Sequence, residues 1–190
     1  MEPGWYVVAL LGPPLVGFAA VAINSLLGGS APVFPGSGQL AMVLPVFLYV
    51  LFLGGPLGEE LGWRGYAQPL LQSRFGPLVT SLVLGFVWGL WHLPLFWIGG
   101  SVQSEIPLWG FMAQIVGNTL IYTWIHNGTG GSVLMAMLFH ASGNTAAFFL
   151  PFLPLEQTGG EMGAFLVFLL LLWAVALAVT LRGRSRAGQS

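Results

Sequence analysis

Glutamate, arginine, histidine and asparagine side chains form three short groups within an otherwise apolar sequence. The first group reads Glu59-Glu60-x-x-x-Arg64. Residues four apart share one face of a helix, so we expect Glu60 and Arg64 to pair. Glu59 points about 100° away around the same helix and is expected to face a cavity. A carboxylate placed there can accept or deliver a proton.

Histidines head the other two groups. His92 stands near the end of an apolar segment, and Pro94 is expected to bend the chain just beyond it. His140 and Asn144 are four residues apart and share a helix face, so both can donate hydrogen bonds into one cavity. Taken alone, His92 also fits a hydrogen-bonded core residue, and His140 with Asn144 fits a polar contact between helices.

The composition around these groups is typical of a membrane protein. Of 190 residues, 56% are hydrophobic and 6% are charged, whereas soluble domains carry about 25% charged residues. We therefore predict an integral membrane protein, embedded in a lipid bilayer, with one membrane domain over residues 1–190. The sequence has no Cys, Lys or Asp, which excludes thiol nucleophiles, a P-loop lysine and an aspartyl dyad within the chain. The net charge of -1 indicates no nucleic-acid partner.

Six apolar stretches approach the length of about 20 residues that a helix needs to cross a bilayer. Segment 57–75 differs, because it mixes apolar residues with Glu, Arg and Gln at helical intervals, and it should face other helices or a wet cavity. Lipid offers no partner to open backbone groups, so we predict an all-α fold, a polytopic transmembrane bundle of six or seven helices. The six stretches span approximately 5–27, 40–56, 78–98, 108–125, 133–153 and 162–181.

Glycines with G-x-x-x-G spacing and tryptophans near the polar groups are interpreted as packing residues. They are Gly54, Gly58, Gly62, Gly85, Gly89, Trp63, Trp88 and Trp91. The segments 28–38, 99–107 and 126–132 are rich in Gly, Pro, Ser and Asn and are predicted loops. His126 falls in the last of them, where solvent exposure accounts for it, so it receives no role.

Basic residues set the expected orientation. Arg182, Arg184 and Arg186 follow the last apolar stretch, whereas the loop glutamates have no basic neighbours. The positive-inside rule then predicts that the basic tail at 182–190 is cytoplasmic. Arginine without lysine, together with abundant Gly and Ala, favours a bacterial source and therefore a bacterial cytoplasmic membrane.

In chain order, E-E-x-x-x-R, an aromatic-x-x-x-His element and His-x-x-x-Asn resemble the motifs of the CPBP (CAAX protease and bacteriocin-processing, Abi) family. The resemblance covers roughly residues 57–150. The second motif of that family usually begins with Phe, where this chain has Trp88. The resemblance implies an intramembrane endopeptidase with its catalytic core at 57–150. Its substrates would be hydrophobic, prenylated, lipid-anchored or bacteriocin-like peptides or proteins in or near the membrane.

Carried over by position, the resemblance implies that Glu59 and His92 activate a water that attacks a peptide carbonyl. His140 and Asn144 would stabilise the oxyanion, and Arg64 would hold the second carboxylate of its motif. Members are often described as metalloproteases, and Glu59, His92 and His140 could supply three ligands of a zinc site with an open fourth position. The sequence has no H-E-x-x-H helix, and a metal-free mechanism fits the same residues, so both forms stay open.

A protein without enzymatic activity could use the same polar side chains. In a proton-coupled or ion-coupled transporter, a channel or a silent immunity protein, the carboxylates and histidines would line a path. A protease predicts that the candidate side chains converge on one cavity, whereas a relay predicts a file across the bilayer. Counting about 1.5 Å per residue along the helices places His92 and His140 at different heights, which favours the relay.

Overall fold

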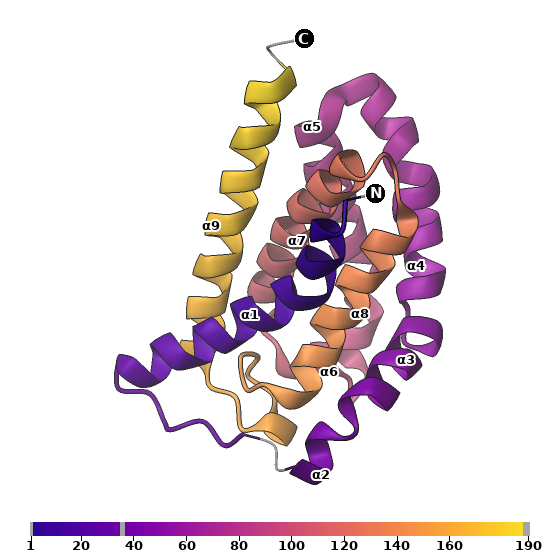
Figure 1. Ribbon diagram of the computed structural model, residues 1–190. Coiled ribbons are helices and arrows are strands. Elements are labelled where there is room, and N and C mark those ends of the chain that lie inside the picture. Colours follow the sequence, from indigo (N-terminus) through magenta and orange to yellow (C-terminus); the bar gives the residue numbers. More distant parts are fainter. Residues whose placement is uncertain (1, 35–36, 188–190) are drawn as a thin grey trace.

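The computed structural model describes the backbone of residues 2–34 and 37–187 and the side chains of residues 2–34 and 38–182. In that part of the chain every regular element is a helix, which confirms the all-α prediction (Figure 1). Seven longer helical segments form the bundle, within the predicted six or seven. The seven are α1 (Gly4–Leu26), α3 (Val43–Leu53), α4 (Pro56–Gly62), α5 (Gln68–Trp91), α7 (Leu108–Gly128), α8 (Val133–Phe149) and α9 (Met162–Ala187), and a π-helical turn (Trp63–Ala67) connects α4 to α5. Short elements join them: α2 (Ser37–Leu40), α6 (Val102–Glu105) and 3₁₀ turns at Leu93–Trp97 and Glu156–Thr158.

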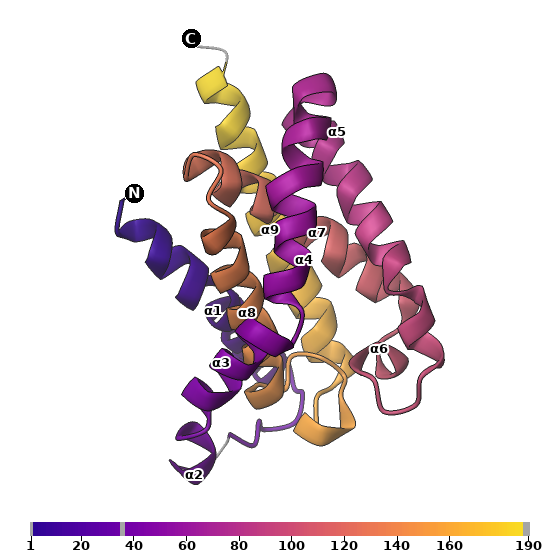
Figure 2. The same cartoon turned by 90° about the vertical axis from the view of Figure 1, so that its right-hand side faces the viewer.

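A helical hairpin presents the first two polar groups. The run from α4 through the π-helical turn into α5 rises to one end of the molecule, and the rest of α5 descends beside it (Figures 1 and 2). The reversal occurs at Gly76, whose φ of 72° and ψ of 171° are non-helical and suit glycine, and Pro77 follows directly. Segment 57–75 is therefore one limb of a hairpin, and its buried polar residues Glu60, Arg64 and Gln68 face other helices as predicted.

Helix α7 lies at the centre of the bundle, where it packs against α5, α8 and α9 (Figure 2). Helix α1 covers α8 and α9 from the other side, and α3 packs on α8. The main core is built from buried side chains of α1, α5, α7, α8 and α9, including Val21, Trp88, Ile125, Met135 and Phe165. Helix α7 is therefore surrounded by other helices on several sides.

Small residues allow α5 and α7 to approach closely. A Cβ atom at Gly85 would stand 2.9 Å from the Val116 Cα atom, and one at Gly89 would stand 2.5 Å from the Met112 sulfur. The packing interpretation of this G-x-x-x-G pair is therefore confirmed. It is wrong for Gly58 and Gly62, where an added Cβ would meet nothing within 4 Å, because their side of α4 faces away from the other helices.

The outer faces of the helices are apolar. Leucine, valine and phenylalanine side chains stand exposed along α1, α3, α5 and α9, among them Leu15, Leu53 and Leu170. Three helical stretches, Gly4–Leu26, Pro56–Trp97 and Met162–Arg182, are long and apolar enough to span a membrane by length and composition, although the second of them is the hairpin. Exposed apolar faces around a core that holds the polar side chains are expected of an integral membrane protein.

Each of the three predicted loops contains some helix. Helix α2 begins at Ser37, near the end of the predicted loop 28–38. Residues 102–105 form α6 within the predicted loop 99–107, and α7 continues through residues 126–128. The loop interpretation of His126 is wrong, because its side chain is only 8% exposed and its Nδ1 atom lies 3.4 Å from Asn127 Oδ1. Trp5 of α1 packs so tightly on Gly128 that a Cβ there would clash with the indole ring, which holds the last turn of α7 in the bundle.

The predicted basic tail belongs partly to α9, whose helix continues through residue 187. Arg182 is exposed at the end of the apolar span. The side chains of Arg184 and Arg186, and residues 188–190 altogether, lie outside the described part of the chain. The cytoplasmic orientation of this end therefore stays a prediction.

Candidate active site

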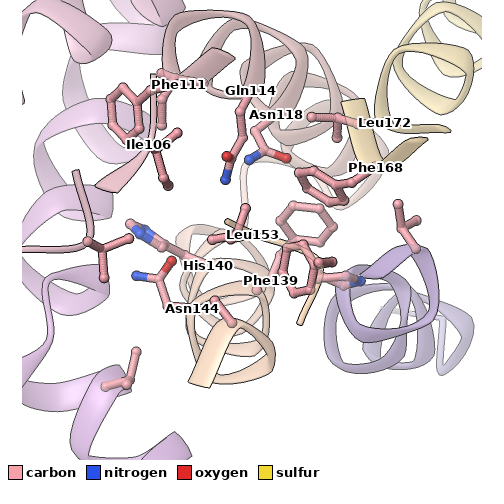
Figure 3. Close-up of a pocket in the computed structure, with 18 of the residues that line it drawn as sticks. Ile106, Phe111, Gln114, Asn118, Phe139, His140, Asn144, Leu153, Phe168 and Leu172 are labelled. Atoms are coloured by element: carbon pink, nitrogen blue, oxygen red, sulfur yellow. The ribbon is translucent and has the colours of Figure 1, made fainter. Parts of the chain in front are cut away.

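A cavity of about 410 Å³ opens between α1, α3, α5, α7, α8 and α9, and polar as well as apolar side chains line it. Four of the predicted site residues line its wall: Glu59, His92, His140 and Asn144. Figure 3 shows the His140 and Asn144 side chains pointing from α8 into the same space. The candidate residues therefore converge on one cavity, as predicted for a protease, and do not form a file across the bilayer.

The prediction that His92 and His140 lie at different heights is wrong, because it treated α5 and α8 as starting at the same level. His92 lies 16 residues after the Gly76 reversal, whereas His140 lies only eight residues after Ser132, the N-cap of α8. The hairpin, however, extends beyond the connection between α7 and α8 (Figures 1 and 2). The extra length of α5 offsets the difference, so His92 and His140 both contact the ring of Trp88, at centroid distances of 5.8 and 5.5 Å.

The hairpin also brings Glu59 to His92. Glu59 lies 17 residues before Gly76, almost the same distance from the turn as His92. At the start of α4, Gly55 has a φ of 110° and leaves no room for a Cβ beside Glu59 Oε1. Glycine at this position thus frees the space in which the Glu59 carboxylate lies.

Trp88 holds both of these side chains. Its indole Nε1–H donates to Glu59 Oε2 at 2.7 Å. Its main-chain carbonyl accepts from His92 Nδ1 at 2.9 Å. A carbonyl oxygen can only accept, so Nδ1 carries the proton and Nε2 of a neutral His92 ring keeps its lone pair. The arrangement leaves one Glu59 oxygen and the His92 Nε2 free to manage the proton of a water molecule.

Behind the cavity wall, Glu60 and Arg64 form the predicted ion pair. Arg64 Nη1 lies 3.1 Å from Glu60 Oε1 and 3.0 Å from Oε2, and the two side chains are 1% and 0% exposed. The Arg64 guanidinium also stacks 3.8 Å from the ring centroid of Tyr122 and 4.5 Å from that of Trp88. Buried charges need such compensation, and here the pair and two aromatic faces supply it.

His140 connects this buried pair to the cavity. Its Nδ1 atom lies 2.8 Å from Glu60 Oε1, so the carboxylate accepts the Nδ1 proton. The ring is therefore oriented with Nε2 as its remaining polar atom, while Asn144 stands one turn further along the same face of α8. The two adjacent glutamates have separate surroundings: Glu59 lines the cavity and Glu60 fixes His140 from behind.

A π-helical turn follows the two glutamates directly. It spans Trp63–Ala67, and both Arg64 within it and Gln68 just after it are fully buried. Such wide turns are rare and occur frequently at functional sites. Arg64 and Gln68, four residues apart on the rising limb, both point into the protein at this turn.

Several parts of the site are missing from the sequence-based prediction. Trp88 is predicted only to pack, yet it also donates to Glu59, and a tryptophan four residues before His92 was the available signal. Tyr122 is absent from the predicted set, and so are Gln114 and Asn118, which line the cavity from α7. Trp91 is 56% exposed, yet its ring packs edge-on against the rings of Trp63 and His92, at centroid distances of 6.3 and 5.0 Å.

The zinc site considered above needs three ligands around one point. Glu59, His92 and His140 all line the cavity. Among the side chains of residues 2–34 and 38–182, however, no three His, Asp or Glu are grouped closely enough to hold one metal ion. The residues as placed do not fit a three-ligand site. The zinc-dependent and the metal-free form both stay predictions.

Comparison with known proteins agrees with the three motifs. The family model for type II CAAX prenyl endopeptidase Rce1-like proteins matches residues 41–146. A curated relative, CAAX prenyl protease 2 of Methanococcus maripaludis, is 36% identical over an alignment of 143 residues, which covers 70% of this chain and 52% of the relative. The chain thus spans about half the length of this relative. More than half of the chain matches the family, so it belongs to the Rce1-like type II CAAX prenyl endopeptidases, and the resemblance to the CPBP family is confirmed.

Proposed function

We propose that this chain is an intramembrane endopeptidase that hydrolyses a peptide bond in hydrophobic, prenylated or lipid-anchored substrates. The observation that carries the proposal is the convergence of Glu59, His92, His140 and Asn144 on one cavity. A carboxylate and an imidazole with a free nitrogen stand on one wall, and hydrogen-bond donors stand on another. Attack of water on a carbonyl needs this combination. Family membership adds support, because a relative carries the name CAAX prenyl protease 2.

In the first step a water molecule attacks the scissile carbonyl carbon. The free oxygen of Glu59, assisted by His92 Nε2, takes one proton from that water as the new C–O bond forms. The carbonyl π electrons move to oxygen and give a tetrahedral oxyanion. The Trp88 hydrogen bond keeps Oε2 of Glu59 occupied, so the other oxygen is directed to the water.

Donors on α8 would stabilise the oxyanion. Asn144 can donate from its amide. His140 already donates from Nδ1 to Glu60, so donation from Nε2 as well requires the doubly protonated ring, whose charge would lie beside a carboxylate that it shares with Arg64. When the oxyanion collapses, the C–N bond breaks and the proton held by Glu59 and His92 passes to the leaving amine. Water has then been divided between the new carboxyl and amino ends.

The remainder of the cavity suits an apolar substrate. Its wall beyond the polar part is formed by aromatic and aliphatic side chains of α8, α9 and the segment between them, including Phe139, Phe148, Phe152, Phe168 and Leu172. A lipid chain or hydrophobic side chains would bury apolar surface there. We further propose that the substrate reaches this cavity from the membrane, and that the C-terminal end of α9 lies in the cytoplasm of a bacterium.

The test is cleavage by the purified chain in detergent. A farnesylated peptide ending in a C-a-a-X sequence is incubated with the protein, and products are identified by mass spectrometry. We expect cleavage at an internal peptide bond of that sequence, with the unprenylated peptide cleaved more slowly. Intact peptide after prolonged incubation with folded protein would contradict the proposal. Repeating the assay after chelation, and again with added zinc, decides metal dependence.

A further inference from the structure

Two amide side chains on α7 line the cavity across from the predicted oxyanion donors. Gln114 and Asn118 are four residues apart and share one helix face. Figure 3 shows both projecting from α7 into the space toward which His140 and Asn144 project from α8. The mechanism above uses neither of them, although they form the second polar wall of the same cavity.

Gln114 has an unmatched acceptor. Its Oε1 atom is buried and, within the described part of the chain, finds no hydrogen-bond donor. Native proteins rarely leave a buried carbonyl oxygen unpaired, because the group has lost its water. An N–H group of a bound molecule would pair with it. The oxygen itself is shielded, but the Gln114 side chain is only half-buried and lines the cavity, so rotation of its terminal amide presents this oxygen to a ligand.

The charge of the cavity limits which ligand fits. Its lining includes the carboxylate of Glu59, and no lysine or arginine is among the described residues that form it. A free carboxylate of a ligand would therefore find no lysine or arginine to pair with there. A carboxamide can donate from its NH₂ group and accept at its oxygen, which matches the C=O and N–H of a peptide group. Gln114 and Asn118 are thus suited to bind the uncharged main chain of a peptide.

We propose that Gln114 and Asn118 bind main-chain peptide groups of the substrate and align its scissile bond with the opposite wall. The proposal rests on the endopeptidase function proposed above. An extended peptide entering this cavity loses hydration at each N–H and C=O group. Gln114 Oε1 accepts one substrate N–H, and Asn118, one helical turn along, pairs with a neighbouring peptide group. The two are positioning residues, and sequence-independent contacts of this kind suit a protease that accepts varied side chains.

The test measures binding separately from cleavage. In protein carrying Glu59→Gln, the affinity of a fluorescent farnesylated C-a-a-X peptide is measured by anisotropy, with and without Gln114→Met or Asn118→Leu. Gln72→Met is the matched control, because Gln72 also has a buried unpaired Oε1 but lies outside the cavity, bonded to Asn127. We expect Kd to rise about three- to tenfold in each cavity variant and to stay unchanged in the control.

A second set of peptides identifies the contact. Each peptide of this set has one amide replaced by an ester, which removes a single N–H. We expect the ester at one position to weaken binding to the Glu59→Gln protein but not to the protein that also carries Gln114→Met. Unchanged Kd in both cavity variants, or no ester position with this behaviour, would overturn the inference. Binding that depends on Gln114 without any cleavage by the unsubstituted chain would instead remove the proposed function and leave the peptide site. Cleavage by the unsubstituted chain together with binding that does not depend on Gln114 would remove the peptide site and leave the proposed function.

Discussion

The indole nitrogen of Trp88 donates a 2.7 Å hydrogen bond to Glu59 Oε2, across the two limbs of the α4–α5 hairpin. The same residue accepts from His92 through its main-chain carbonyl. One side chain and one peptide group of a single residue therefore set the orientation of both groups proposed to activate water. This relationship depends on tryptophan, because phenylalanine has no ring donor.

Trp88→Phe is expected to lower kcat about tenfold with little change in KM. The substitution keeps the aromatic packing and removes a hydrogen bond to a charged group, so Glu59 loses its fixed orientation. Steady-state cleavage of the farnesylated peptide measures the effect. Trp97→Phe, at an indole that is 78% exposed, is the control and should behave as the parent. Equal kcat in all three proteins would show that Trp88 only packs.

Arg64→Met is expected to cost about 3 to 5 kcal/mol of folding stability, because it leaves the Glu60 charge buried without its partner. Arg74→Met removes an exposed arginine from the same hairpin limb and should change stability little. Denaturation in detergent gives the comparison. Adding Glu60→Gln to Arg64→Met should restore part of the loss, and a double variant as unstable as the sum of the single ones would argue against a coupled pair.

Gly85→Ala is expected to destabilise the protein by about 1 to 3 kcal/mol, since the new methyl group would press on the backbone of α7 at Val116. Gly62→Ala adds the same group where nothing lies within 4 Å, and its better helix propensity should leave stability equal or slightly higher. Thermal unfolding of both variants tests the packing. Similar losses in the two would mean that α5 and α7 are not in this close contact.

Acid is expected to loosen the contact between the end of α1 and the start of α9. The Ser30 hydroxyl, the Asn24 amide and the Ser30 main-chain N–H donate to the Glu161 carboxylate, and these bonds lower its pKa. The folded-state pKa is below the unfolded value of about 4.3, so the contribution is present above that pH and is lost as pH falls through the folded-state pKa.

The melting temperature, measured between neutral and acidic pH, reports how much the hydrogen bonds of Glu161 stabilise the protein. Parent protein should lose more stability on acidification than Glu161→Gln, which cannot ionise at this position. Glu156→Gln removes another exposed carboxylate of the same connecting segment and serves as the matched control. Parallel pH curves for the parent and Glu161→Gln would contradict the assignment.

Local spacing predicted those features that depend on one helix. The pairing of Glu60 with Arg64 follows from four-residue spacing, and the outward apolar faces follow from composition. Contacts between distant segments could not be predicted in this way. His140 and Glu60 are 80 residues apart, and their meeting depends on how α8 lies against the hairpin.

Errors arose where tertiary packing overrides local chemistry. The Asn-Gly-Thr-Gly-Gly segment after His126 is typical of a loop, yet contact with Trp5 holds the preceding turn as buried helix. Gly58 and Gly62 have the spacing of a packing motif but no neighbouring helix. The height argument failed because the position of a hairpin turn relative to the other helix ends cannot be counted from sequence.

The central claim is that Glu59 activates water in the shared cavity. It is tested most directly by kcat/KM for the farnesylated C-a-a-X peptide in the parent, in Glu59→Gln and in the exposed-carboxylate control Glu156→Gln, all purified as folded protein. The account predicts a loss of about a hundredfold or more in Glu59→Gln, because the amide cannot take a proton, and parent activity in the control. Parent activity in Glu59→Gln would contradict it.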